Sequence, residues 1–348
     1  MGRTGIVDTN LAAAIAGRLA PPGPQLDINE AADVVVMLRD LTAQAEQHVR
    51  DVTGLHGVVG PATVVDRAGW ARANAEGFDV VLEPLKDTLL AKQGKAGAAV
   101  TAKVTAVQMG VLLSWLSSKV LGQYEAFQPA GQAGRLLLVA PNIVETERRL
   151  EVDPRDFRLW VAIHEVTHRT QFTAVEWLHD HVRSEINALL SASGLDRPDA
   201  MLQRLKQVAA NPRGVGSIAE LLQTPEQREV MDRVTALMSL LEGHAEHVMD
   251  GVGPSVVPSV GQIRGRFEER RRDKGNPLER VLRRLLGLDL KALQYAEGSR
   301  FVAHVVDAVG MTGFNQVWQS PATLPTRAEI KAPQDWVTRV HGASSASA

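Results

Sequence analysis

Residues 160–168 read Trp-Val-Ala-Ile-His-Glu-Val-Thr-His, and this stretch decides how the rest of the chain is interpreted. Residues four positions apart project from one face of a helix, so His164 and His168 can offer their imidazole nitrogens to one ion. Glu165 lies beside that face, where it can take a proton from an attacking water and pass it to a leaving group. The spacing therefore predicts a helix that carries a metal site and a general base.

The segment around this motif favours a long buried helix. No proline or glycine interrupts Phe157 to His181, and Asp153-Pro154 is a typical helix start. Histidines and a glutamate are costly to bury on such a helix unless a partner satisfies them. The alternative is a pair of hydrogen-bonded core histidines beside a surface glutamate. A chance match to the motif in a chain with ten histidines has a probability on the order of one or two per cent.

A catalytic zinc site needs a third protein ligand and an open position. The chain has no cysteine, so this ligand must be histidine, aspartate or glutamate. One helical stretch holds five candidates: Glu242, His244, Glu246, His247 and Asp250. The small residues Gly243 and Ala245 would let this helix approach the first one closely. A polar helix face without metal is the other interpretation.

Composition narrows the class of protein. The chain has 348 residues, a formal net charge of −2, 45% apolar and 22% charged residues, which is ordinary globular composition. The small net charge argues against nucleic acid or an anionic membrane as the main partner. The apolar stretches are short or broken by polar residues, and no signal peptide is recognisable, so we expect no membrane partner and a cytoplasmic location. No Gly-x-Ser-x-Gly segment or phosphate-binding loop is present.

We expect a mainly helical chain. Helical periodicity covers five ranges: 29–51 ending near Gly54, 67–91 with an interruption around Gly77 and Pro84, 97–122 packed in the core, 226–250, and 278–309. One strand signal is strong, at Leu136–Ala140. The charged run 264–274 reads as a solvated segment, with a lid as the alternative. The expected organisation is an N-terminal segment 1–24, a single domain 25–340 and a disordered tail 341–348.

Several of these stretches resemble a known family. Residues 139–144 and 157–172, together with Leu241-Glu242-Gly243-His244-Ala245, resemble actinobacterial zincin-like proteins, and the similarity spans about residues 25 to 320. These proteins are labelled zinc-dependent metalloproteases or hydrolases, and one branch is associated with biosynthesis of the deazaflavin coenzyme. The resemblance implies a mainly α zincin-like metallopeptidase core with at most a small β-sheet or hairpin.

The resemblance also bears on the third ligand. It implies zinc held by His164, His168 and Glu242, so we predict Glu242, with His244, His247 or Glu246 as alternatives. Glu246, one turn on, would accept a hydrogen bond from a ligating histidine, although aspartate is the commoner residue there in the family.

Zincins often use a tyrosine or histidine to stabilise the oxyanion of the tetrahedral intermediate. The two tyrosines of this chain, Tyr124 and Tyr295, both lie in segments that match the family. We predict Tyr295, because it follows the second metal helix. The alternative for each is a core tyrosine with a satisfied hydroxyl.

The predicted function is zinc-dependent hydrolysis of a peptide or small amide, with Glu165 as general base. The alternative is a zinc-binding scaffold or binding protein without activity. Four protein ligands with no open position would favour that alternative.

Overall fold

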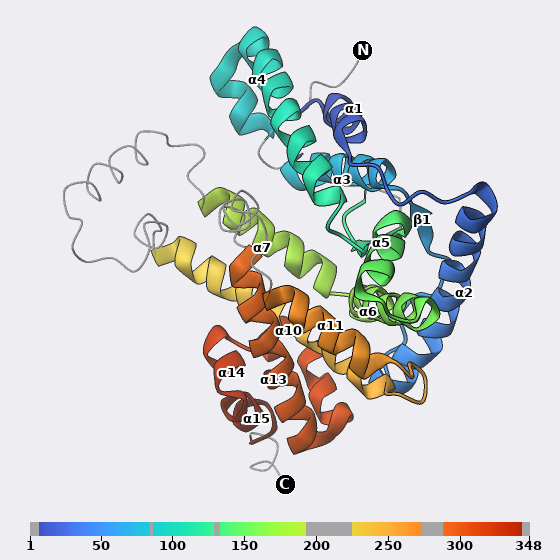
Figure 1. The fold of residues 1–348 in the computed structure, drawn as a ribbon. Helices are drawn as coiled ribbons and strands as arrows, with labels where there is room; N and C mark the ends of the chain where they lie inside the picture. Colours follow the sequence, from blue (N-terminus) through green and yellow to red (C-terminus); the bar gives the residue numbers. More distant parts are fainter. Residues whose placement is uncertain (1–6, 84–85, 129–132, 193–224, 273–287, 343–348) are drawn as a thin grey trace.

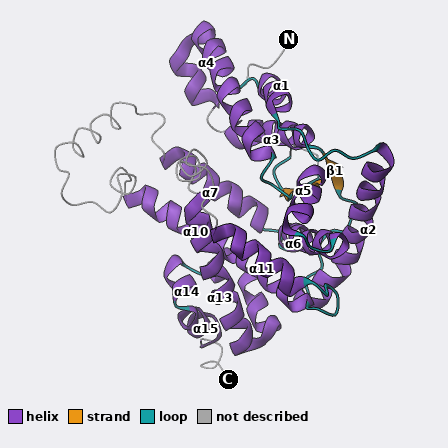
Figure 2. Cartoon of the chain, in the orientation of Figure 1, coloured by secondary structure: helices purple, strands orange, loops and turns teal. Residues whose placement is uncertain are grey.

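The computed structural model describes residues 7–83, 86–128, 133–192, 225–272 and 288–342 (Figure 1). Helices make up most of this part of the chain, and one small sheet lies among them (Figure 2). The predicted mainly helical fold with a small sheet is therefore confirmed. The helices are α1 (Thr9–Leu19), α2 (Ile28–Thr53), α3 (Arg67–Leu82), α4 (Lys86–Ser117), α5 (Ala140–Leu150), α6 (Pro154–Ala174), α7 (Leu178–Ala192), α10 (Pro225–Val252), α11 (Val260–Arg272), α13 (Leu288–Phe314), α14 (Arg327–Lys331) and α15 (Pro333–His341).

The sheet has three strands in the order β1-β3-β2: β1 (Thr63–Val65), β2 (Gly122–Glu125) and β3 (Arg135–Val139). β1 runs parallel to β3, and β2 runs antiparallel to it with Gly122 opposite Leu138. The predicted strand is the central one, because its apolar run is buried on both faces. Ala140 instead begins α5, since Pro141 suits the first turn of a helix.

The ends of the helices follow local sequence signals. α2 begins at a capping box of Asp27 and Glu30 and ends at Gly54, which has a left-handed conformation with a φ of 66°. The predicted end near Gly54 is confirmed. The predicted interruption at Gly77 is wrong, because this glycine lies inside α3, which continues to Leu82. Residues 343–348 of the predicted tail, and 278–287 of the last long helix, lie outside the described residues.

Helix α4 differs from the buried helix that we expected. Val100, Val104, Val107 and Val111 are 45–65% exposed, while the opposite face packs against α1 at Gly110. The prediction failed because an alanine-rich run without a polar face does not show which side is buried. Residues Val100–Ser117 are long and apolar enough to span a membrane, and a third of them are buried. Core helices of globular proteins share this property, so the absence of a membrane partner stays a prediction.

Of the three apolar clusters in the described part of the chain, two contain residues of α10. One surrounds α6, with buried side chains from α2, β3 and α5 such as Leu38, Leu138 and Ile143. The other contains Phe301, Phe314 and Trp336 from α13 and the C-terminal helices. Helix α10 contributes residues to both clusters, and it packs against α6 and α13 (Figure 1). This arrangement places α6 and α10 side by side where the clusters meet.

Candidate metal centre

Helix α6 carries the histidine motif as the sequence predicted. It begins where the Asp153 side chain accepts a hydrogen bond from the Asp156 N–H, followed by Pro154 in the first turn. It continues without interruption to Ala174. His164 and His168 therefore lie one turn apart on the same face, and their rings meet edge to face with centroids 4.6 Å apart.

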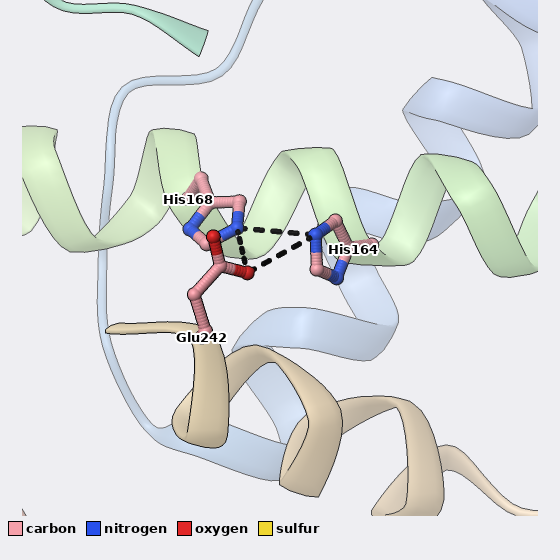
Figure 3. A group of neighbouring side chains, drawn as sticks. All are labelled: His164, His168 and Glu242. Atoms are coloured by element: carbon pink, nitrogen blue, oxygen red, sulfur yellow. Dashed lines mark hydrogen bonds and ion pairs between the residues drawn. The ribbon is translucent and has the colours of Figure 1, made fainter. Parts of the chain in front are cut away.

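Glu242 on α10 completes a compact group with these histidines (Figure 3). The two Nε2 atoms lie 3.2 Å apart, and Glu242 Oε2 lies 3.7 Å from His164 Nε2 and 3.5 Å from His168 Nε2. An ion with four tetrahedral bonds of about 2.0–2.1 Å requires ligand atoms about 3.3 Å apart. The three atoms thus have the spacing of one face of such a tetrahedron, and the fourth position is left for another ligand.

The charge of the group also fits a cation. The side chains of His168 and Glu242 are only 15% and 13% exposed. Burial alone would lower the pKa of the His168 imidazole, but the charge and hydrogen bond of Glu242 outweigh it and raise the pKa to about 9. A buried carboxylate beside two imidazoles is stabilised by a positive charge among them. Two nitrogens and one carboxylate oxygen suit a divalent metal such as zinc.

The other candidate ligands lie elsewhere. Among the described residues, the group of potential ligand atoms within 4.8 Å of one another contains only His164, His168 and Glu242. His244 is fully buried against Phe314, with ring centroids 5.3 Å apart, and burial lowers its pKa to about 3. His247 is half-buried, and burial lowers its pKa as well.

Gly243 does not face α6 as we predicted. A Cβ atom at this position would lie 2.2 Å from the carbonyl carbon of Gly298, so Gly243 allows a close approach of α10 to α13. The prediction failed because the helical pattern shows which face of α10 carries Gly243, but not which helix packs against that face.

Gln171 supports His168, and the sequence analysis missed it. Its Oε1 atom lies 3.0 Å from His168 Nδ1, which leaves the Nε2 atom of His168 directed at the other ligands. A signal was present, because a residue three positions after a histidine lies on the same helix face. His164 Nδ1 lies 3.3 Å from the Met249 sulfur. Glu246 lines the pocket, and its support of a histidine stays a prediction.

Glu165 lies beside the group and is buried, with 6% of its surface exposed. Burial raises the pKa of its carboxyl to about 7, as does the charge of Glu242, while His168 acts in the opposite direction. The edge strand β2 covers it closely, because a Cβ at Gly122 would lie 2.6 Å from Glu165 Cγ. The geometry thus fixes a carboxyl that can exchange a proton near neutral pH next to the ligands.

An open pocket of about 890 Å³ contains the group. Its walls include β2, and the apolar side chains of Trp160, Phe172 and Met238. Residues 264–272 of the charged run belong to helix α11, on which Arg266 and Glu269 are exposed as expected. Arg264 and Phe267 of the same helix line the pocket. The lid function proposed for this run stays a prediction.

The two tyrosines have different outcomes. Tyr124 lines the pocket and packs against Phe172, with ring centroids 5.9 Å apart, and burial raises the pKa of its hydroxyl. A Cβ at Gly134 would lie 2.2 Å from that hydroxyl, so the hydroxyl packs against Gly134. The side chain of Tyr295 lies outside the described residues, so its predicted role is not tested.

Comparisons with known proteins identify the family of the chain. The chain is similar to a protein from Chloroflexus aurantiacus, which is provisionally described as a hydrolase with a novel fold. The two sequences are 31% identical, and the structures have a TM-score of 0.69, covering 96% of this chain and 98% of the other. No curated protein matches the chain. The actinobacterial subgroup and the coenzyme association stay predictions. The family model for zincin-like metallopeptidases matches residues 7–337. The chain therefore belongs to the zincin-like metallopeptidase family.

Proposed function

We propose that the protein is a zinc-dependent hydrolase that cleaves peptide bonds. The main support is the group of His164, His168 and Glu242, which has the spacing of three tetrahedral ligands and opens onto a large pocket. A structural zinc site is closed by four protein ligands, whereas a catalytic site keeps one position open. A buried glutamate beside the ligands has no purpose in a structural site.

The residues have separate roles in the proposed reaction. His164, His168 and Glu242 hold the metal, which when bound supplies Lewis-acid chemistry that polarises a carbonyl group and activates water. Glu165 accepts the proton of the attacking water and then donates it to the departing amine. In the metal-free protein, burial raises the pKa of this carboxyl to about 7, which favours uptake of a proton by Glu165.

The pocket favours an extended peptide over a compact amide. In the described part of the chain, β2 is an edge strand of the sheet, and Gly122, Gln123 and Tyr124 from this strand line the pocket. An edge strand can pair its free backbone groups with an extended chain. The apolar walls around Trp160 and Phe267 would accept a large apolar side chain. We therefore propose peptides with aromatic or long aliphatic residues as substrates.

The scaffold alternative gains no support from these observations. It requires a closed site, while the described group supplies three ligands beside an open pocket.

The first test is the zinc content per chain, measured by elemental analysis of untagged protein. We expect one zinc in the wild type and in Glu226→Ala, which removes an exposed glutamate from the same helix. We expect a large loss in Glu242→Ala. A folded wild type that binds no zinc when zinc is supplied would refute the proposal.

The second test screens the zinc-loaded protein against a peptide library. We expect cleavage beside large apolar residues, and loss of cleavage in Glu165→Gln with zinc retained. Full activity in Glu165→Gln would exclude the proposed general base.

A further inference from the structure

A chain of buried hydrogen bonds lies behind the ligand His168. Gln171, which has no exposed surface, places its Oε1 atom 3.0 Å from His168 Nδ1. Its Nε2 atom lies 2.9 Å from the carbonyl oxygen of Leu241 and 3.0 Å from His244 Nδ1. One side-chain amide on α6 therefore contacts a metal ligand on its own helix and two groups on α10, 70 and 73 residues away.

The direction of these hydrogen bonds follows from the Leu241 carbonyl. A carbonyl oxygen can only accept a hydrogen bond, so the nitrogen of the Gln171 amide must face it. The amide oxygen then faces His168, and because that oxygen also only accepts, His168 must carry its proton on Nδ1. The lone pair of His168 Nε2 is thereby left for the metal.

The same argument assigns the opposite tautomer to His244. The second N–H of Gln171 points at His244 Nδ1, which must accept, so the proton of His244 is on Nε2. That Nε2 atom is buried near Trp318 and has no hydrogen-bond partner among the described residues. A buried N–H without an acceptor is costly. The hydrogen bond that His244 Nδ1 accepts from Gln171 would offset the cost of this buried N–H.

We infer that Gln171 is the positioning residue of the metal site. Its oxygen fixes the tautomer and orientation of His168, and its nitrogen holds Leu241, the residue before Glu242. One amide thus sets two of the three ligands relative to each other without touching metal or substrate. This inference rests on the proposed metal-binding function.

The test is the affinity of the full chain for zinc, measured by competition with a chromophoric chelator. Gln171→Met replaces the side chain by one of similar shape that cannot form the hydrogen bonds to His168, Leu241 and His244. We expect this variant to bind zinc about 10–100-fold more weakly. Gln171→Glu keeps an acceptor for His168, so we expect it to recover part of the loss. The matched control is Gln262→Met, which removes a hydrogen bond to the Glu151 carbonyl but none to a metal ligand, and should leave the affinity unchanged.

A folded Gln171→Met that binds zinc as tightly as the wild type would overturn the inference. Absence of zinc binding in the wild type would instead refute the proposed function.

A second measurement does not depend on zinc or on any variant. Nitrogen NMR of wild-type protein with labelled histidines should show His244 protonated on Nε2. A proton on Nδ1 would reverse the direction of the chain and overturn the inference.

Discussion

Replacing Gly298 by alanine should force two helices apart. A Cβ at this position would lie 1.9 Å from the carbonyl oxygen of Ser239 and 2.7 Å from its carbonyl carbon. Both atoms belong to the backbone of α10, so no side chain can rotate away. Ordinary contacts of carbon atoms are about 3.5 Å, so α10 and α13 must separate locally by roughly 1.5 Å.

The cost can be estimated from known effects. Forcing an extra methyl group into a packed interior costs up to about 3 kcal/mol, and alanine in a helix recovers about 1 kcal/mol relative to glycine. The net loss is about 2 kcal/mol of unfolding free energy. With an unfolding entropy of about 2.1 cal/mol/K per residue, the melting temperature of the 348-residue chain should fall by about 3 °C.

The metal site should respond to the same change, because Glu242 lies on α10 one turn after Ser239. A shift of this helix moves Oε2 away from the two histidine nitrogens, so we expect weaker zinc binding as well as a lower melting temperature.

The matched control is Gly265→Ala on the exposed side of α11, where a Cβ would meet nothing within 4 Å. We expect this variant to be slightly more stable than the wild type, by up to about 1 kcal/mol. Differential scanning calorimetry of the metal-free proteins and a zinc titration would measure both effects. A Gly298→Ala protein that melts at or above the wild-type temperature and binds zinc normally would refute the argument.

Three further predictions follow from the same geometry. Gly122→Ala should displace Glu165 by about 1 Å and lower kcat by about 100-fold on the peptide found by screening, with zinc content unchanged; an unchanged kcat would contradict this. Because His168 has a pKa of about 9 without metal, zinc binding near pH 7 should release a proton, and the affinity for zinc should rise with pH up to about 9. Calorimetry in buffers of different ionisation enthalpy would detect the released proton. Equal heats of binding in these buffers would disprove the release. Burial would raise the pKa of Glu329, but its hydrogen bonds to Arg339 outweigh that effect and lower the pKa. Glu329→Gln should therefore be less stable than the wild type at neutral pH. This loss should shrink as the pH falls through the folded-state pKa, and a difference that is constant with pH would exclude the ionised pair.

The sequence predicted the ligands better than their surroundings. His164, Glu165 and His168 share one short helical segment, so local geometry was enough to relate them. Glu242 came from a resemblance, and the structure brings it to the histidines. Gln171 was missed because its partners, Leu241 and His244, lie 70 and 73 residues away. Contacts at that separation depend on tertiary packing, which periodicity does not describe.

The same limit explains the errors in the fold. The apolar face of α4 looked buried because composition alone does not show whether a neighbour covers it. Gly77 looked like an interruption, although a single glycine lowers helix stability by only about 1 kcal/mol and tertiary contacts can compensate. The strand at Leu136 was predicted well, because an apolar run of this length between Gly134 and Pro141 is too short for a typical helix.

The position of Glu242 along α10 connects the metal site to distant parts of the molecule. Leu240 and Leu241 belong to the apolar cluster of the C-terminal helices, while Val248 and Met249 belong to the cluster around α6. Glu242 therefore lies on α10 between a segment that packs in one apolar cluster and a segment that packs in the other. A substitution that weakens packing among the C-terminal helices, such as one at Trp336, would change the position of α10. Its first measurable effect would be a lower affinity for zinc.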